Sequence, residues 1–342
     1  MERSAVICGL GAWVPPHVVT NDMLAAELDT SDEWIRARTG IRRRHVVAPG
    51  SNTGDLAVRA GRRALDSAGL AAVDAVVLAT SSPDRACPAT APSVATRLGL
   101  TGAAAFDVAA VCTGFVYALA TGAGLIASGA ASTALVVGAD TFSTLTDPAD
   151  RATRAVFGDG AGAVVLRGGR VAERGAVCAV DLGSDGTGAE LITKTAGHYF
   201  RMDGPRVFMR AVQRMEQSVR SVLGRAGWDL QDIDLLVPHQ ANSRILDACA
   251  GRLGLPAARV ARHLGEVGNT VAASIPLALA DAAAARRLRA GHRVVLTGFG
   301  GGLTWGSVAL SWPEVRAIPP TTAGEAEAVG DRESSVPPHT RE

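Results

Sequence analysis

The sequence predicts an α/β fold in which sheets are covered by helices on both faces. Apolar runs of strand length alternate with alanine-rich stretches of helical length along most of the 342 residues. Such alternation is typical of strands that are buried between layers of helices. Hydrophobic residues make up 47% and charged residues 20% of the chain, which is the composition of a globular protein. The order of elements partly repeats, which predicts two similar halves that meet near residue 170 with a site between them.

The first half, residues 1–170, begins with a strand and continues as alternating helices and strands. The helix expected at residue 52 has an Asn or Thr cap at its start. Residues 108–139 carry no charge and are long enough on paper to cross a bilayer. Five glycines interrupt them, so we expect a helix buried on all sides, followed by a separate strand. The expected strands are 5–9, 73–80, 104–108, 134–138 and 161–166, and the other expected helices are 52–68 and 91–98.

The second half, residues 171–316, repeats this pattern. Its expected helices are 207–226, 243–253 and 271–288, and its expected strands are 233–237, 293–298 and 307–312. Beyond these elements, residues 317–342 are rich in Pro, Gly, Ser, Thr and Glu and contain almost no large apolar residue. This composition predicts a disordered tail.

Charge and cysteine content exclude several classes of function. The formal net charge is +1, with 34 basic and 33 acidic residues, so no global field favours nucleic acid or a membrane as a partner. The five cysteines are scattered and form no CxxC pair, which argues against disulfides and against a metal site. The N-terminus lacks the apolar stretch of a signal peptide. We therefore expect a cytoplasmic protein.

Cys112 is the first candidate for chemistry. It follows the strand 104–108, at the start of the uncharged helix. A thiol at a helix N-terminus faces unpaired N–H groups and the positive end of the helix dipole, which favours its thiolate. A small buried cysteine is also common core filling, so both interpretations stay open on this segment alone.

Three further segments place polar or glycine residues at the ends of elements. His239 follows an apolar strand, where it could serve a site or be a hydrogen-bonded core histidine. Asn269 precedes a buried helix and could merely cap it. The glycine-rich loop at 298–302 lets backbone N–H groups approach a ligand closely, but it lacks the Lys-Ser/Thr ending of a phosphate loop. Together, a Cys, a His, an Asn and a glycine loop suit thioester chemistry with an oxyanion held by backbone N–H groups.

Four longer motifs make the sequence similar to a known family. They are residues 29–41 (DTSDEWIRARTGI), 156–163 (VFGDGAGA), 237–242 (VPHQAN) and 268–270 (GNT). The chain resembles β-ketoacyl-acyl carrier protein synthase III, of the thiolase superfamily, from about residue 6 to residue 312. The resemblance implies a five-layered αβαβα fold with two pseudo-duplicated halves, and a homodimer. It also implies acyl-CoA-primed decarboxylative condensation with malonyl-acyl carrier protein, without a permanently bound cofactor.

The resemblance also assigns roles to individual residues. It implies that Cys112 is the acyl nucleophile, that His239 and Asn269 drive decarboxylation, and that the N–H groups of Cys112 and Gly302 form an oxyanion hole. Arg244 matches a carrier-protein contact. Residues that match coenzyme A contacts are Thr30, Trp34, Arg38, Arg151, Gly204 and Asn242.

Two residues match positions of the acyl pocket. Phe299 corresponds to an apolar residue beside the malonyl carboxylate. Cys87 stands where relatives that prefer very short primers often carry a phenylalanine, at a position that reaches the partner subunit's pocket. The smaller side chain predicts a primer longer or bulkier than acetyl, unless neighbouring residues fill the space.

Departures from the family pattern leave the pathway open. The stretch 191–202 is shorter than usual, Met209 replaces a frequent lysine, and Val267 and Val271 flank Gly-Asn-Thr where His and Ser are more usual. A specialised starter-unit enzyme of polyketide synthesis, or an acyltransferase with another acceptor, therefore stands beside fatty-acid initiation. Thiolases, elongating synthases and chalcone synthases fit less well. A non-catalytic acyl-CoA-binding module and a cysteine protease are the alternatives from other classes.

Overall fold

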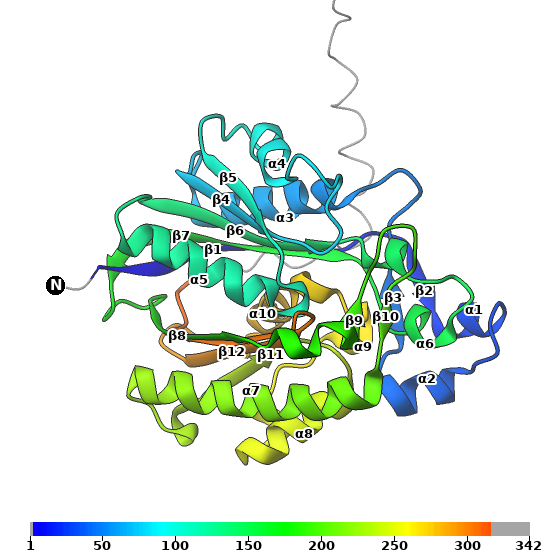
Figure 1. Cartoon of the computed structure of the whole chain (residues 1–342). Helices are drawn as coiled ribbons and strands as arrows, with labels where there is room; N and C mark the ends of the chain where they lie inside the picture. Colours follow the sequence, from blue (N-terminus) through cyan, green and yellow to red (C-terminus); the bar gives the residue numbers. More distant parts are fainter. Residues whose placement is uncertain (1–2, 316–342) are drawn as a thin grey trace, which may run out of the picture.

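The computed structural model describes residues 3–315, and the expected tail at 317–342 lies outside them. Five layers follow one another in the order helix, sheet, helix, sheet, helix (Figure 1). α3 (Thr53–Ala68) and α4 (Ala91–Arg97) cover one outer face, and α7 (Gly204–Ala226) and α8 (Ser243–Leu253) cover the other. Within the described residues, no helix is both long and apolar enough to span a membrane.

The first sheet has five strands in the order β1-β7-β6-β4-β5. β4 runs parallel to β5 and β6, whereas β7 is antiparallel to both β6 and β1. The strands are β1 (Arg3–Trp13), β4 (Ala75–Ala79), β5 (Ala104–Val108), β6 (Thr133–Asp140) and β7 (Gly160–Arg170).

The second sheet repeats this arrangement with four strands in the order β11-β12-β13-β8. β11 is parallel to β12, and β13 is antiparallel to both β12 and β8. The series β4-β6-β7-β1 therefore matches β11-β12-β13-β8 in every pairing direction. The strands are β8 (Val177–Ser184), β11 (Leu235–Pro238), β12 (Arg293–Gly300) and β13 (Thr304–Ser311).

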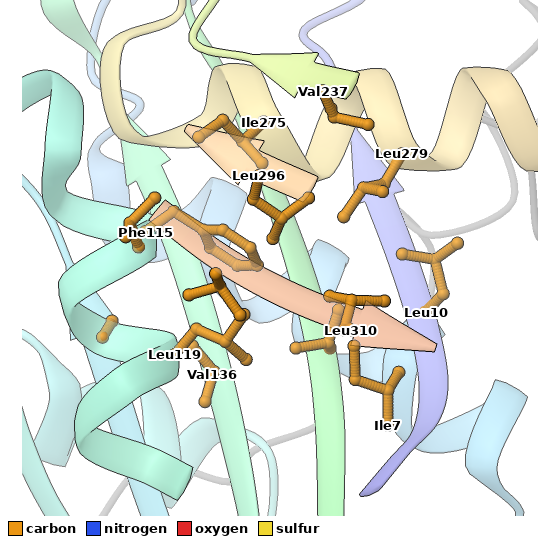
Figure 2. Packing of buried hydrophobic residues seen from close by; sticks show 14 of the residues in the cluster. Ile7, Leu10, Phe115, Leu119, Val136, Val237, Ile275, Leu279, Leu296 and Leu310 are labelled. Atoms are coloured by element: carbon orange, nitrogen blue, oxygen red, sulfur yellow. The ribbon is translucent and has the colours of Figure 1, made fainter. Parts of the chain in front are cut away.

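The middle layer consists of α5 (Gly114–Ala127) and α10 (Ser274–Ala284), which lie between the two sheets (Figure 1). Figure 2 shows Phe115 and Leu119 of α5 together with Ile275 and Leu279 of α10, surrounded by apolar side chains of both sheets. All four side chains are buried. Each is worth about 1.5–3 kcal/mol of burial free energy. The absence of charge in the α5 sequence is thus explained, because this helix contacts a sheet on two sides.

Local capping signals placed several boundaries correctly. α3 begins after Asn52, whose side chain accepts a hydrogen bond from the Asp55 backbone in a capping box, and it ends at a left-handed Gly69. α8 begins after Asn242, which caps the Ile245 N–H at 3.0 Å. β5 and α8 have the bounds that the sequence predicted.

Several elements were not predicted from the sequence. β8 contains the charged Asp181, which is buried and accepts hydrogen bonds from Ser218 and Ser221, so its strand pattern is interrupted. The expected helix 271–288 is shorter, because it opens with a 3₁₀ turn and α10 ends at Ala284. The other unpredicted elements are β2 (Val18–Thr20), α1 (Asn21–Ala25), α2 (Asp32–Thr39), β3 (Arg43–His45), α6 (Arg151–Arg154), β9 (Ile192–Thr193), β10 (Arg201–Met202) and α9 (Leu264–Val267).

Short 3₁₀ turns connect many of these elements. They are Val111–Thr113, Phe142–Leu145, Gly186–Leu191, Leu230–Asp232, Ala257–Arg259 and Val271–Ala273. The first and last of them begin the two middle helices, where the sequence places its candidate catalytic residues.

Candidate active site

Cys112 lies in the 3₁₀ turn that joins β5 to α5. Val111 just before it has a φ of 47°, which is uncommon for a β-branched residue and turns the chain sharply. Thr113 closes the turn with a hydrogen bond from its N–H to the carbonyl of Ala110 at 3.0 Å. The thiol therefore stands at the N-terminal end of a helix, as the sequence predicted.

A cavity of about 490 Å³ brings Cys112 together with His239 and Asn269. Its walls are mainly apolar, and they come from both halves of the chain. Arg38, a sequence-predicted coenzyme A contact, also lines it. The three candidate catalytic residues come from β5–α5, from the end of β11 and from the segment before α10.

The thiol of Cys112 is protonated at neutral pH. Burial, together with the nearby carboxylate of Asp140, raises the pKa of Cys112 to about 12. The expectation that the helix terminus favours the thiolate is therefore wrong for the free site, because burial penalises the charged form more strongly. A base has to take the proton when the sulfur reacts.

His239 is the candidate for that base, because it lines the same cavity. It follows Pro238 at the end of β11, and its backbone N–H donates to the carbonyl of Thr297 at 2.8 Å. Its Nδ1 lies 2.7 Å from Ser274 Oγ, whereas its Nε2 is buried and has no hydrogen-bond partner among residues 3–315. Burial lowers the pKa of His239 to about 3, opposed by a hydrogen bond to the backbone of Val271. The imidazole is therefore neutral at physiological pH.

Asn269 has its backbone and its side-chain oxygen engaged. Its N–H donates to Val156 at 2.9 Å, and its carbonyl accepts from Gly158 at 3.0 Å. Its Oδ1 accepts from the N–H of Val271 at 3.0 Å. This bond is local, but Asn269 caps neither the turn nor α10, whose N-caps are Thr270 and Ala273. The Nδ2 donors have no protein acceptor in the described part of the chain, so they are available to a ligand.

A buried carboxylate holds this region together. Asp140, at the end of β6, is fully buried, and burial raises its pKa to about 6. Its Oδ1 accepts from the N–H groups of Ser81 and Ser82 at 2.7 and 3.0 Å. Its Oδ2 accepts from the N–H of Ala272 at 3.0 Å, in the turn that follows Asn269. The carboxylate thereby ties the first half to the catalytic segment of the second.

Trp34 and two arginines form a cluster beside the cavity. α2 begins after Ser31, which caps the Trp34 N–H at 3.1 Å. The guanidinium carbons of Arg38 and Arg151 lie 4.3 and 5.0 Å from the Trp34 ring centroid. Arg151 also pairs with Asp29 at 3.1 Å. Predicted contacts from distant segments are thus brought together.

The remaining predicted residues divide into two groups. Gly204, Asn242, Arg244 and Phe299 line the cavity, and the hydroxyl of Thr30 is buried without a hydrogen-bond partner in the described residues.

Cys87 and Gly302 do not line the cavity. Cys87 lies in an exposed loop at 83–89. Gly302 is also exposed, whereas Gly300 and Gly301 are the loop glycines that approach the turn of Cys112.

Three phenylalanines of the cavity were missed by the sequence analysis. Phe142, Phe157 and Phe200 pack against one another with ring centroids 4.6 to 5.2 Å apart, and Cys112 packs against their cluster. Phe157 belongs to the 156–163 motif and could have been found there. Phe142 lies just after the end of β6, and Phe200 lies in the loop before β10. No sequence pattern marks either of them.

Comparisons with known proteins show the family of this chain. A family model described as "3-Oxoacyl-[acyl-carrier-protein (ACP)] synthase III" matches residues 106–186, and the model for the C-terminal part of the same family matches residues 223–312. A β-ketoacyl-[acyl-carrier-protein] synthase III of Pseudomonas aeruginosa is 60% identical over 92% of this chain and 98% of the relative. The chain belongs to the β-ketoacyl-[acyl-carrier-protein] synthase III family.

Other relatives of this condensing-enzyme family agree. The β-ketoacyl-[acyl-carrier-protein] synthase III 3 of Streptomyces coelicolor is 56% identical over 93% of this chain and 100% of its own length. The crystal structure of the Pseudomonas aeruginosa PAO1 synthase has a TM-score of 0.89 and covers 92% of this chain and 99% of that one. The priming β-ketosynthase of the R1128 polyketide pathway is 34% identical, with a TM-score of 0.86 and coverage of 91% and 97%. The thiolase-like fold expected from the resemblance is confirmed.

The raised pKa of Cys112 makes a testable prediction about its reactivity. We expect its alkylation by iodoacetamide to be slow at pH 7 and to accelerate up to at least pH 10, since only the thiolate reacts. The measurement is peptide mass spectrometry of the 112-containing peptide across pH. Exposed Cys87 serves as the internal control. A Cys112 rate that levels off near pH 7 would show that the thiol is already ionised.

Proposed function

We propose that this synthase condenses an acyl-CoA primer with malonyl-acyl carrier protein through an acyl-enzyme on Cys112. The observation that carries the proposal is the single apolar cavity shared by Cys112, His239 and Asn269. Residues 3–315 contain no cluster of ligating side chains that could hold a metal ion. The chemistry is therefore assigned to these side chains and to backbone N–H groups.

In the first step, Cys112 becomes acylated. His239 Nε2 takes the thiol proton while the sulfur attacks the thioester carbon of the acyl-CoA. The carbon–sulfur bond to coenzyme A then breaks, and the leaving thiolate recovers the proton from His239. The neutral imidazole and the unpartnered Nε2 support this role.

In the second step, the acyl-enzyme meets malonyl-acyl carrier protein. Loss of CO₂ leaves an enolate whose oxygen accepts hydrogen bonds from His239 Nε2–H and Asn269 Nδ2–H. The enolate carbon attacks the acyl carbonyl carbon and the carbon–sulfur bond to Cys112 breaks. The departing thiolate then takes a proton from water, which restores the thiol. Ser274 Oγ, 2.7 Å from Nδ1, can donate or accept, so it is compatible with either tautomer of the histidine.

The oxyanion of each tetrahedral intermediate is assigned to backbone N–H groups. The N–H of Cys112 and that of Gly302 are the proposed donors. The close approach of the glycine loop to Cys112 supports a donor from this loop. Gly302 itself is exposed, and Gly300 and Gly301 are the glycines of this loop that lie nearest to the turn of Cys112.

Coenzyme A is proposed to bind through Thr30, Trp34, Arg38, Arg151, Gly204 and Asn242. The nucleotide is assigned to the cluster around Trp34, and the pantetheine arm to Gly204 and Asn242 at the cavity. The 5.0 Å between Arg151 and the Trp34 ring is too short to hold a base between them, since each stacked layer needs about 3.5 Å. One of the two side chains has to move when a nucleotide is bound.

Acyl carrier protein is proposed to dock over the cavity mouth. Arg244 is exposed, lines the cavity and has no ion pair among the described residues, so it can receive the phosphate of a phosphopantetheine arm. A homodimer is also proposed. β5 supports it, because its outer edge pairs with no other described strand and so can pair with a second copy.

The primer is proposed to be larger than acetyl, and the product to start a fatty acid or a polyketide. The apolar walls of the cavity support an acyl chain of some length. A cytoplasmic location is proposed from the five unpaired cysteines. No observation favours transfer to an acceptor other than malonyl-acyl carrier protein.

Acylation of Cys112 is the first test. Incubation with a panel of acyl-CoAs followed by intact-mass analysis should show one acyl group per chain. We expect the mass shift to vanish in Cys112→Ala and to persist in the matched variants Cys87→Ala and Cys249→Ala. Stable acylation of Cys112→Ala would place the nucleophile elsewhere.

A second test distinguishes the roles of His239 and Asn269. In both alanine variants CO₂ release from malonyl-acyl carrier protein should fall roughly 10²–10³-fold, because one donor to the enolate is lost. Asn269→Ala should acylate Cys112 like wild type. His239→Ala should acylate slowly at pH 7 and progressively faster as the pH is raised to 10, because the ionised fraction of the thiol then grows about tenfold per pH unit below its pKa of about 12. Wild-type CO₂ release in both variants would refute the decarboxylation role.

The cluster around Trp34 predicts that the enzyme distinguishes acyl donors with a nucleotide from acyl donors without one. Arg151→Ala should raise the KM for acyl-CoA roughly tenfold, because it removes a cationic contact to the nucleotide. The KM for the matching acyl-pantetheine thioester, which lacks the nucleotide, should change little. An equal rise for both donors would mean that Arg151 serves the fold through Asp29.

Primer size is tested at Cys87. Wild type should prefer butyryl- or hexanoyl-CoA to acetyl-CoA in kcat/KM. Cys87→Phe should reverse this order, because in the proposed homodimer the phenylalanine would reach into the acyl pocket of the partner subunit. Each lost methylene contact is worth about 0.8 kcal/mol, or roughly fourfold in rate. Cys87→Ala is the matched control. A wild type that favours acetyl-CoA would contradict the pocket assignment.

A further inference from the structure

The two middle helices begin with the same unusual turn. Val111 and Val271 have φ values of 47° and 50°, and each opens a three-residue 3₁₀ turn that leads directly into α5 or α10. Since the two sheets also share their pairing directions, the turns are equivalent by internal duplication. Ala272 is thus the counterpart of Cys112.

The strands beside these turns are equivalent too. β6 and β12 each have eight residues, so Gly138 corresponds to Gly298 when the strands are aligned from their first residues. A Cβ on Gly138 would lie 2.4 Å from the carbonyl oxygen of Ala272, and a Cβ on Gly298 would lie 3.4 Å from that of Cys112. Each strand therefore passes beneath the turn of the other half.

The two turns differ at the last residue of those strands. β6 ends at Asp140, whose carboxylate accepts the N–H of Ala272 at 3.0 Å. β12 ends at Gly300, which has no side chain to offer. The Cys112 N–H finds no acceptor among residues 3–315 other than its own sulfur. A Cβ on Gly300 would lie only 2.8 Å from this nitrogen.

We propose that Gly300 is a positioning residue that keeps the N–H of Cys112 open to the thioester oxygen of the substrate. In the other half, the equivalent N–H belongs to Ala272 and is hydrogen-bonded to Asp140, so it is not available to a ligand. The inference rests on the proposed function, in which the Cys112 N–H stabilises an oxyanion. It explains in terms of one side chain why the backbone N–H of the duplicated turn is open in only one half.

The variant Gly300→Ala tests this role. Its methyl group has to displace the Cys112 N–H from the position it holds, so acylation by the best acyl-CoA should fall roughly 10²–10³-fold. Alkylation by iodoacetamide at pH 9 needs the thiolate but no oxyanion donor, and it should stay within about threefold of wild type. Gly186→Ala is the control, because a Cβ there meets no neighbouring atom and the residue lies outside the site.

The outcomes separate the two proposals. A wild type that no acyl-CoA acylates would refute the proposed function and this inference together. An acylated wild type with an equally fast Gly300→Ala would refute only the inference. Loss of acylation and alkylation in equal measure would also overturn it, because Gly300 would then merely pack against the turn.

Amide hydrogen exchange gives a test in the wild type that needs no variant. With residue-resolved mass spectrometry, the Cys112 amide should exchange at least about tenfold faster than the Ala272 amide, which is hydrogen-bonded. Acylation should then protect the Cys112 amide and leave that of Ala272 unchanged. Equal protection of the two amides in the free protein would overturn the inference.

Discussion

The hydrogen bond between the Asp140 carboxylate and the Ala272 N–H joins the two halves at the point where the site is built. One oxygen of this carboxylate accepts hydrogen bonds from the N–H groups of Ser81 and Ser82 in the first half of the chain. The other oxygen accepts the bond from Ala272 in the second half. A buried carboxylate without such partners would cost several kcal/mol. The bonds therefore specify how the turn after Asn269 lies relative to β6.

The chemistry of the site depends on its burial away from water. In the apolar cavity the neutral forms of Cys112 and His239 are both favoured, and Asp140 adds to the effect on the thiol. Neutral partners suit a reaction in which charge develops only when the substrate is present, because preorganised donors then act in a low dielectric. Asn269 fits this arrangement, since its oxygen is held by Val271 and its nitrogen is left to donate.

Internal duplication offers a way to see which features are structural and which are functional. Equivalent turns, helices and strands occur in both halves, with valines of positive φ at the same place. Features present twice belong to the fold. Features present once, such as the thiol of Cys112 and the missing side chain at Gly300, mark where the halves have diverged.

By itself the sequence determined the α/β class, most helices and strands, the family, and Cys112, His239 and Asn269 as candidates. Alternating apolar runs, caps such as Asn52 and short motifs are local, so they can be read along the chain. Only the tertiary structure decided that Phe142 and Phe200 meet Cys112, and that burial outweighs the helix terminus in setting the pKa of the thiol. Desolvation and long-range packing depend on which distant segments surround a group, and no local pattern encodes them.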